Sequence, residues 1–102
     1  MEAKKKKIIS HQISFYSDET EEEIMLAATF YLKKFLPSKN RIVFNIPERV
    51  YLNLGEEKFR EIFSDQIIEL DNGKENFLKV NIVKSNKYIS ENRFETFEIK
   101  EI

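Results

Sequence analysis

Residues 8–17 alternate between apolar and polar side chains, which is the pattern of a half-buried β-strand. One face carries Ile9, His11, Ile13 and Phe15, and the other carries Ser10, Gln12, Ser14 and Tyr16. From Asp18 the period changes to that of an amphipathic helix, which we expect to run to about Leu36. Asp18 and Glu21 have the spacing of a capping box at its start, and Pro37 ends it.

A second set of elements follows with the same periods. The pattern predicts strands over Arg41–Ile46 and Arg49–Asn53, a helix capped by Asn53 that runs to about Leu70, and a strand over Phe77–Val83. Pro47 separates the first two of these strands, because proline cannot donate to a β-ladder. Asn72 and Gly73 supply a left-handed stop for the helix. A polar turn at residues 85–87 precedes a last, charged strand near residues 94–101.

The strand–helix–strand layout thus occurs twice, at an offset of about 35 residues. The coincident pairs are Tyr16 with Tyr51, Glu21 with Glu56, Glu22 with Glu57 and, after one residue of slippage, Asn45 with Asn81. The apolar stripes of the two helices also coincide. We therefore expect two similar units, residues 8–46 and 48–84, with a groove between them. Identity between the units is too low to indicate gene duplication.

The element order β-α-β-β-α-β, followed by one more strand, predicts an α+β fold. A ferredoxin-like arrangement and a pseudo-two-fold pair of units share this order, and the sequence does not choose between them. We expect residues 1–7 to form a flexible basic arm. Residues 8–102 have the length of a single domain.

Composition excludes several classes of protein. The chain has no cysteine, which excludes disulfides, thiolate metal sites and cysteine nucleophiles. Lysine and arginine number 17 and aspartate and glutamate 18, so no global field favours nucleic acid or a membrane surface. No apolar run approaches the ~20 residues of a membrane span, and no signal peptide is visible. We expect the chain to act in the cytoplasm, without membrane contact.

No catalytic or metal-binding motif is recognisable. The single histidine, His11, lacks a nucleophile or acid at a catalytic spacing, and we expect it to be packed and hydrogen-bonded or to lie near the sheet end. The carboxylates within residues 19–23 surround the first turn of one helix, where the helix dipole accounts for them. A metal site needs ligands that converge from several elements. We therefore expect no enzymatic activity, no metal and no cofactor.

The strand faces that point away from the predicted helices combine tyrosine and asparagine. An aromatic body with a hydrogen-bonding tip makes an adaptable contact surface. The candidate contact residues are Tyr16, Tyr51, Asn45, Asn81 and Phe77. The sequence thus favours a non-enzymatic protein–protein interaction module, which binds a partner segment in the groove between the units, on this sheet face or at an open edge. A second copy of the chain is one candidate partner.

Nucleic-acid binding is the alternative interpretation. It would use the four consecutive lysines of the basic arm, which are Lys4, Lys5, Lys6 and Lys7. These side chains could contact phosphates, and Tyr16 and Tyr51 lie on predicted strands 1 and 3. RNA-recognition domains place base-stacking aromatics on those strands. The glycine–aromatic run of these domains is missing from residues 49–53, so protein binding is preferred.

The chain contains 13 lysines, 15 glutamates and 13 isoleucines. Enrichment in lysine and glutamate is the general signal of hyperthermophile proteins. In this composition and in its length, the chain resembles the small orphan proteins of filamentous viruses of hyperthermophilic archaea, of the Acidianus type. The eight asparagines would also fit a low-GC bacterium or its phage. The resemblance implies a viral protein that works in the host cytoplasm, without known enzymatic function, and binds another protein.

Overall fold

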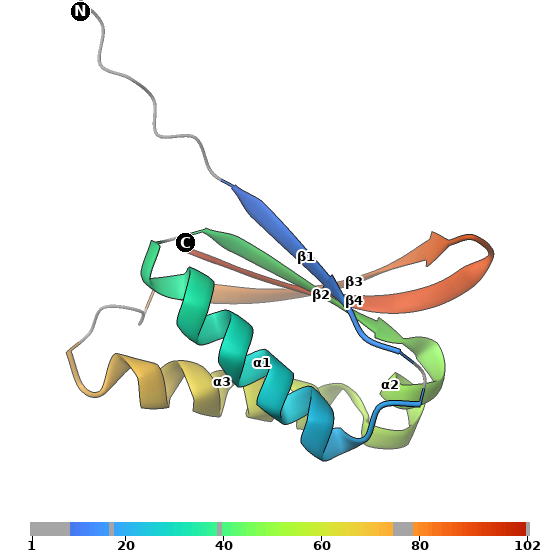
Figure 1. Cartoon of the computed structure of the whole chain (residues 1–102), viewed down its shortest axis with the longest axis horizontal. Coiled ribbons are helices and arrows are strands. Elements are labelled where there is room, and N and C mark those ends of the chain that lie inside the picture. Colours follow the sequence, from blue (N-terminus) through green and yellow to red (C-terminus); the bar gives the residue numbers. More distant parts are fainter. Residues whose placement is uncertain (1–8, 17, 39, 75–78, 102) are drawn as a thin grey trace, which may run out of the picture.

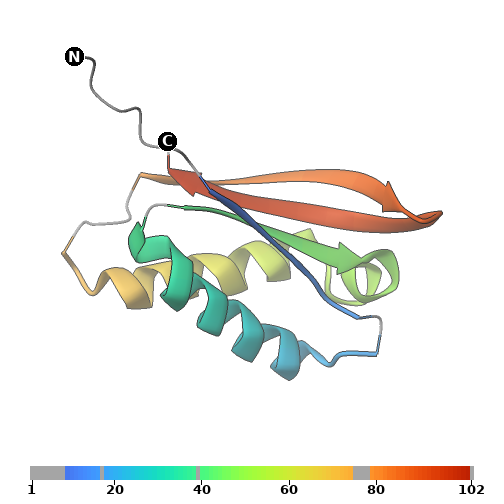
Figure 2. The same ribbon diagram turned by 45° about the horizontal axis from the view of Figure 1, so that its top comes forward.

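The structure, a computed structural model, describes residues 9–16, 18–38, 40–74 and 79–101. Its fold is α+β, as predicted: a four-stranded mixed sheet carries the helices on one face (Figures 1 and 2). The elements are β1 (Ser10–Ser14), α1 (Glu21–Phe35), the 3-10 turn η1 (Leu36–Ser38), β2 (Arg41–Pro47), α2 (Glu48–Leu54), α3 (Glu56–Asp71), β3 (Val80–Ile89) and β4 (Asn92–Glu101).

The strands lie in the order β1-β2-β4-β3. β2 pairs in parallel with β1 and antiparallel with β4, and β3 pairs antiparallel with β4. β1, α1 and β2 therefore form a parallel strand–helix–strand unit. The helices α2 and α3 connect β2 to β3, and β4 lies between these two strands. The predicted stop of α3 is confirmed, since Asn72 has a left-handed backbone with φ of 49°.

Residues 49–53 are helical, which corrects the strand predicted there. Val50 is buried, and Tyr51 and Leu54 pack against the core. These three positions have the spacing of one helix face, whereas a strand that buried Val50 would also bury Leu52, which is 70% exposed. Because α2 replaces the predicted strand, the repeat of two strand–helix–strand units is not confirmed, nor is the groove between them.

The helices start at other residues than the predicted caps. Thr20 caps α1 in place of Asp18, and its Oγ1 accepts a hydrogen bond from the backbone N–H of Glu23 over 3.1 Å. The sequence contains two overlapping patterns of a capping residue followed three positions later by glutamate, and the chain uses the second. Gly55 precedes α3 as its N-terminal cap, in place of the predicted cap Asn53.

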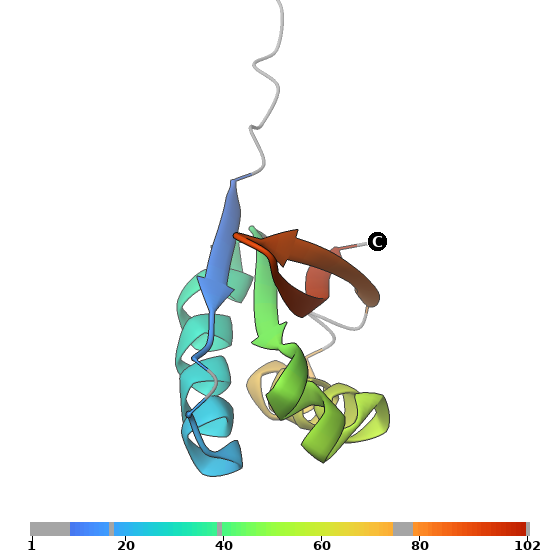
Figure 3. The same ribbon diagram turned by 90° about the vertical axis from the view of Figure 1, so that its right-hand side faces the viewer.

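β3 and β4 form a long hairpin that reverses at Ser90 and Glu91. Residues 85–87, predicted as a turn, continue β3 instead, because each is paired with a residue of β4 in unbroken register. Ser90 and Glu91 have positive φ values of 48° and 70°, as in the two-residue turns that suit twisted hairpins. The hairpin curls over the sheet face that has no helices, which we call the outer face (Figure 3).

The core lies between the sheet and the helices α1 and α3. Phe44 stacks on Phe63 with ring centroids 5.0 Å apart, and Phe59 lies 5.6 Å from Phe97. All four rings are fully buried. Each contributes about 2–3 kcal/mol through burial. The strands contribute Phe15, Ile42, Phe44, Ile46, Phe97 and Ile99 to this core.

Candidate functional site

Asn45 points away from the helices, as predicted, but it is only 1% exposed. Its Nδ2 donates to Ser14 Oγ over 3.1 Å, and Thr96 Oγ1 donates to its Oδ1 over 3.0 Å. The hairpin closes over Ser14, Asn45 and Thr96, since Lys87 Nζ donates to Gln12 Oε1 of β1 over 2.8 Å. Asn45 therefore links three strands and is not available as a free contact residue.

Tyr51 is a second correction, because it lies on α2 and not on the sheet. Its ring stacks on Phe59 with centroids 6.1 Å apart, and Lys84 Nζ lies 5.3 Å from its centroid. Asn81 is exposed on β3, and its role as a partner contact stays a prediction.

The remaining predicted site residues lie outside the part of the chain that the structure describes. They are Phe77, the candidate protein contact, and the candidate phosphate contacts Lys4, Lys5, Lys6 and Lys7. Their roles therefore stay predictions.

Tyr16 lines a groove between the tip of the β3–β4 hairpin and the ends of β1 and β2. We call this the hairpin groove, formed by residues 15–16, 47–49, 88 and 91–94. Its volume of about 770 Å³ lies within the range of protein sites for small ligands. Phe15, Pro47 and Phe94 give it apolar walls, so a partner side chain can be desolvated there.

Two exposed tyrosines line the groove from separate elements. The backbone N–H of Tyr16 donates to Glu19 Oε1 over 2.8 Å, and its carbonyl accepts from the N–H of Glu19 over 3.1 Å. The preceding residue, Phe15, stacks in the core on Phe44. The loop is thus held at both sides while Tyr16 is 74% exposed. On the hairpin, Tyr88 is 68% exposed.

The rim of the groove mixes charges of both signs. Arg93 Nε lies 3.3 Å from Glu48 Oε2, and Arg93 Nη2 lies 3.1 Å from the buried Glu95 Oε1. Arg49 and Glu91 are exposed and form no ion pair within the described part of the chain. The groove therefore offers one uncommitted cation and one uncommitted anion to a partner.

Behind the groove, ion pairs tie the hairpin to α3. Lys84 Nζ lies 3.4 Å from Glu95 Oε2 and 3.8 Å from Glu56 Oε1, and Arg60 Nε lies 2.9 Å from Glu56 Oε2. The hydrogen bond from Arg60 lowers the pKa of Glu56. Burial alone would lower the pKa of Lys84, but its interactions with Glu95, Tyr51 and Glu56 together outweigh burial and raise that pKa. These charges hold the hairpin in place.

His11 is packed and hydrogen-bonded, as expected from the sequence. Its ring stacks on Phe35 with centroids 3.6 Å apart, and its Nε2 lies 3.2 Å from Asn40 Nδ2. Among the residues that the structure describes, no three or more histidines, aspartates or glutamates are grouped as a metal site requires. No helix in this described part is long and apolar enough to cross a membrane.

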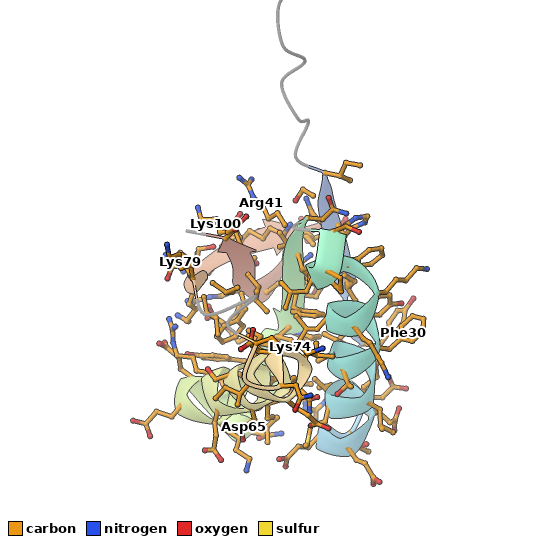
Figure 4. The ribbon with its side chains drawn as sticks, turned by 90° about the vertical axis from the view of Figure 1, so that its left-hand side faces the viewer. Phe30, Arg41, Asp65, Lys74, Lys79 and Lys100 are labelled. Atoms are coloured by element: carbon orange, nitrogen blue, oxygen red, sulfur yellow. The ribbon has the colours of Figure 1, made fainter. Side chains whose placement is uncertain are left out.

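Basic side chains gather at the end of the molecule opposite the hairpin groove, where Figure 4 shows Arg41, Lys74, Lys79 and Lys100. Arg41 and Lys100 share the carboxylate of Glu98, at 3.5 and 3.2 Å. The chain enters β1 at this end, because the N–H of Arg41 bonds to the carbonyl of Ile9. Strand β1 therefore separates Ile9, the first described residue, from Tyr16.

The scan against protein-family models finds no match for the chain, and no curated protein matches its sequence. The candidate site is therefore defined by its geometry.

Tyr88 and Arg93 were missed in the sequence, because residues 85–87 were interpreted as a turn. A signal was present. The β-rich runs on both sides converge on Ser90 and Glu91, a polar pair at which a hairpin can reverse.

Proposed function

We propose that the chain is a non-enzymatic protein-interaction module that binds an extended partner segment in the hairpin groove. The observation that carries this proposal is the pair Tyr16 and Tyr88. Both rings are exposed, both line one groove, and their backbones are held by separate elements. Tyrosines of this kind supply much of the energy of protein interfaces, since they bury large area at little cost in conformational entropy.

The turn of the hairpin supports the same site. Ser90 and Glu91 are not glycines, although each has positive φ. A non-glycine residue in this region costs roughly 1–2 kcal/mol, and Asn-Gly would be the less strained choice. Strained residues cluster at functional sites. Glu91 lies on the groove rim, which gives the retained side chain a use in binding.

The charges favour a protein segment over a polyanion. Glu48 and Glu91 line the same groove as Arg49 and Arg93. A phosphate backbone in the groove would meet both carboxylates, whereas a peptide can place a residue of each sign. The amide of Asn92 adds a hydrogen-bonding group that suits a peptide backbone.

Nucleic-acid binding is the second candidate function, and the basic end of the molecule favours it. Arg41, Lys79 and Lys100 lie at the same end of the molecule as the start of β1, and Lys74 lies at this end on the side of α3 (Figure 4). Glu98 neutralises part of this charge. Such binding would weaken steeply with added salt, because it depends on the release of counterions.

Selection of random displayed peptides against the whole chain tests the proposed function. A selected peptide is then added to isotopically labelled protein, and amide chemical shifts are followed. We expect saturable changes at residues 15–16, 47–49 and 88–94 that persist in moderate salt. The proposal is overturned if no peptide is selected, or if all changes lie elsewhere. Salt-sensitive binding of oligonucleotides at Arg41 and Lys100 would support the second candidate.

A further inference from the structure

Strand β1 forms an outer edge of the sheet, and half of its backbone groups face outward. The carbonyl of Ile9 accepts from Arg41, and the N–H of Phe15 donates to Asn45. Odd-numbered residues of β1 therefore bond to β2. Because bonding direction alternates along a strand, Ser10, Gln12 and Ser14 turn their N–H and C=O groups to the free edge.

The opposite edge of the sheet, β3, carries two features that hinder the addition of another strand. Arg60 Nη1 donates to the carbonyl of Ile82 over 2.9 Å, and Lys84 points from β3 to the helix side of the sheet, where it pairs with Glu95. A covering side chain and an inward-pointing charge are devices that prevent strand addition. β1, with the sequence Ser-His-Gln-Ile-Ser, contains no lysine, proline or acidic residue. Among the described residues, only the β3 edge therefore carries features that block strand addition.

A row of aromatic rings on α1 runs beside the free edge of β1. Phe30 packs edge-on against Tyr31 at 5.1 Å, Tyr31 stacks on Phe35 at 6.1 Å, and Phe35 stacks on His11 of β1 at 3.6 Å. Phe30 is 57% exposed, on the flank of α1 that faces away from Lys74 and α3 (Figure 4). We call these four residues the aromatic row. It has no covering element within the described residues.

We propose that the β1 edge accepts an extended segment of a partner protein as an additional strand, with its helix-side residues packed on the aromatic row. This inference rests on the proposed function, because it assumes that the chain binds a protein. The β1 edge is a second contact beside the hairpin groove, and the binding mode is strand addition. Backbone hydrogen bonds supply affinity in this mode, and alternate side chains supply specificity. The segment therefore carries an apolar residue at every second position.

Charge selects the other positions of the segment. Lys34 Nζ lies 5.8 Å from the centroid of Phe30 and 5.4 Å from that of Phe35, so it borders the row on the helix side. Lys87 reaches Gln12 on the outer face. Neither lysine has an acidic partner in the part of the chain that is described. An added strand therefore meets a cation on each face, which favours aspartate and glutamate between its apolar residues.

A second copy of the chain does not fit this edge through its own β1. Figure 3 shows α1 beneath β1, at the margin of the helix layer. Paired strands lie about 4.8 Å apart, so the two α1 helices would be brought to roughly that separation. Packed helices need about 8–10 Å. The occupant is therefore a segment that brings no helix of its own.

Peptides selected against the whole chain, as above, test this inference with two variants of one residue. Gln12→Pro removes an edge N–H but leaves the β1–β2 ladder intact, whereas Gln12→Ala keeps the N–H. We expect edge-binding peptides to lose at least about tenfold in affinity with Gln12→Pro and to be unaffected by Gln12→Ala. They should also slow hydrogen exchange at Ser10, Gln12 and Ser14.

N-methylated peptides provide a test that does not depend on the folding of Gln12→Pro. Methyl groups on alternate residues block strand addition in one phase of the alternation and are tolerated in the other. Equal loss in both phases, or no loss in either, overturns the inference. So does selection of basic peptides that bind as well as acidic ones.

The two proposals fail in different ways. Peptides that lose affinity with Tyr16→Ala or Tyr88→Ala but ignore Gln12→Pro leave the proposed function standing and overturn strand addition. If no peptide is selected at all, both proposals fall. Loss of affinity with Gln12→Pro, together with slowed exchange in β1, supports strand addition.

Discussion

Arg60 and Ile82 connect α3 to the β3 edge of the sheet: the guanidinium Nη1 of Arg60 donates to the backbone carbonyl of Ile82 over 2.9 Å. The same side chain pairs with Glu56 on its own helix. One arginine thus covers an edge carbonyl of β3 and anchors the hairpin that bounds the groove. The opposite edge, β1, is the one that lies beside the aromatic row.

Loss of the hydrogen bond from Arg60 to Ile82 should affect both the stability of the protein and its self-association. We expect Arg60→Ala to lower the free energy of unfolding by about 1–2 kcal/mol and to promote self-association as concentration rises, because the edge of β3 is freed. Urea denaturation and sedimentation velocity measure the two effects. Lys58→Ala is the matched control, since the contact of Lys58 within the described residues is an exposed pair with Glu21. Equal stability and equal self-association of the two variants would show that Arg60 does not protect the β3 edge.

The hydrogen bonds that join Ser14, Asn45 and Thr96 on the outer face should contribute strongly to the free energy of unfolding. We expect Asn45→Ala to destabilise the protein by about 2–3 kcal/mol, because it leaves the hydroxyls of Ser14 and Thr96 without their partner. Chemical denaturation provides the measurement. Asn81→Ala, an exposed change on β3, should alter stability by less than about 0.5 kcal/mol. Similar costs at Asn45 and Asn81 would show that these hydrogen-bonded side chains are solvated.

The strain in the hairpin turn can be measured directly. Glu91→Gly should raise the free energy of unfolding by about 1 kcal/mol, because glycine adopts a positive φ freely. Gly55→Ala should act in the opposite sense: its φ is 88°, and no atom lies near the added methyl group, so the cost is conformational. Thermal and urea unfolding test both. A destabilising Glu91→Gly would contradict the assigned turn.

The ion pairs behind the groove predict how stability depends on pH. Because the pKa of Glu56 is lowered from 4.5, its contribution is present above that value and is lost as pH falls through the folded pKa. The pKa of Lys84 is raised above 10.5, so its contribution is complete below that value and is lost as pH rises through the folded pKa. We therefore expect a plateau of stability between these limits.

Urea denaturation at several pH values checks this profile. Glu56→Gln should flatten the acid limb, whereas Glu57→Gln, an exposed change at the next residue, should leave it unchanged. An acid limb that is the same in all three proteins would show that Glu56 does not couple folding to protonation.

Local patterns in the sequence predicted much of the fold. The alternation in β1, the apolar stripe of α1 and the left-handed stop at Asn72 are each determined by neighbours in the chain, and the structure confirms them. The failure at residues 49–53 has a physical cause. Val50, Leu52 and Leu54 alternate as a strand does, and Val50, Tyr51 and Leu54 also fit one helix face. Tertiary packing selected the second pattern.

The candidate site was predicted in part. Alternation over residues 8–17 places Tyr16 on the polar side of a strand; the side chain is exposed, but it lies in the loop after β1, which ends at Ser14. Tyr88 and Arg49 could not be placed from local pattern, because they reach the groove only through the curl of the hairpin and the helical state of α2. Strand order decides which residues meet at the ends of β1 and β2, and a sequence period contains no information on strand order.

The most direct test of peptide binding in the hairpin groove is the affinity of one selected peptide for four proteins, measured by titration calorimetry. The proteins are the parent chain, Tyr16→Ala, Tyr88→Ala and, as a control, Ile68→Ala, which removes an exposed apolar residue of α3. We expect each tyrosine variant to bind about tenfold or more weakly and the control to bind as the parent does. Equal affinity for all four proteins would contradict the proposed function.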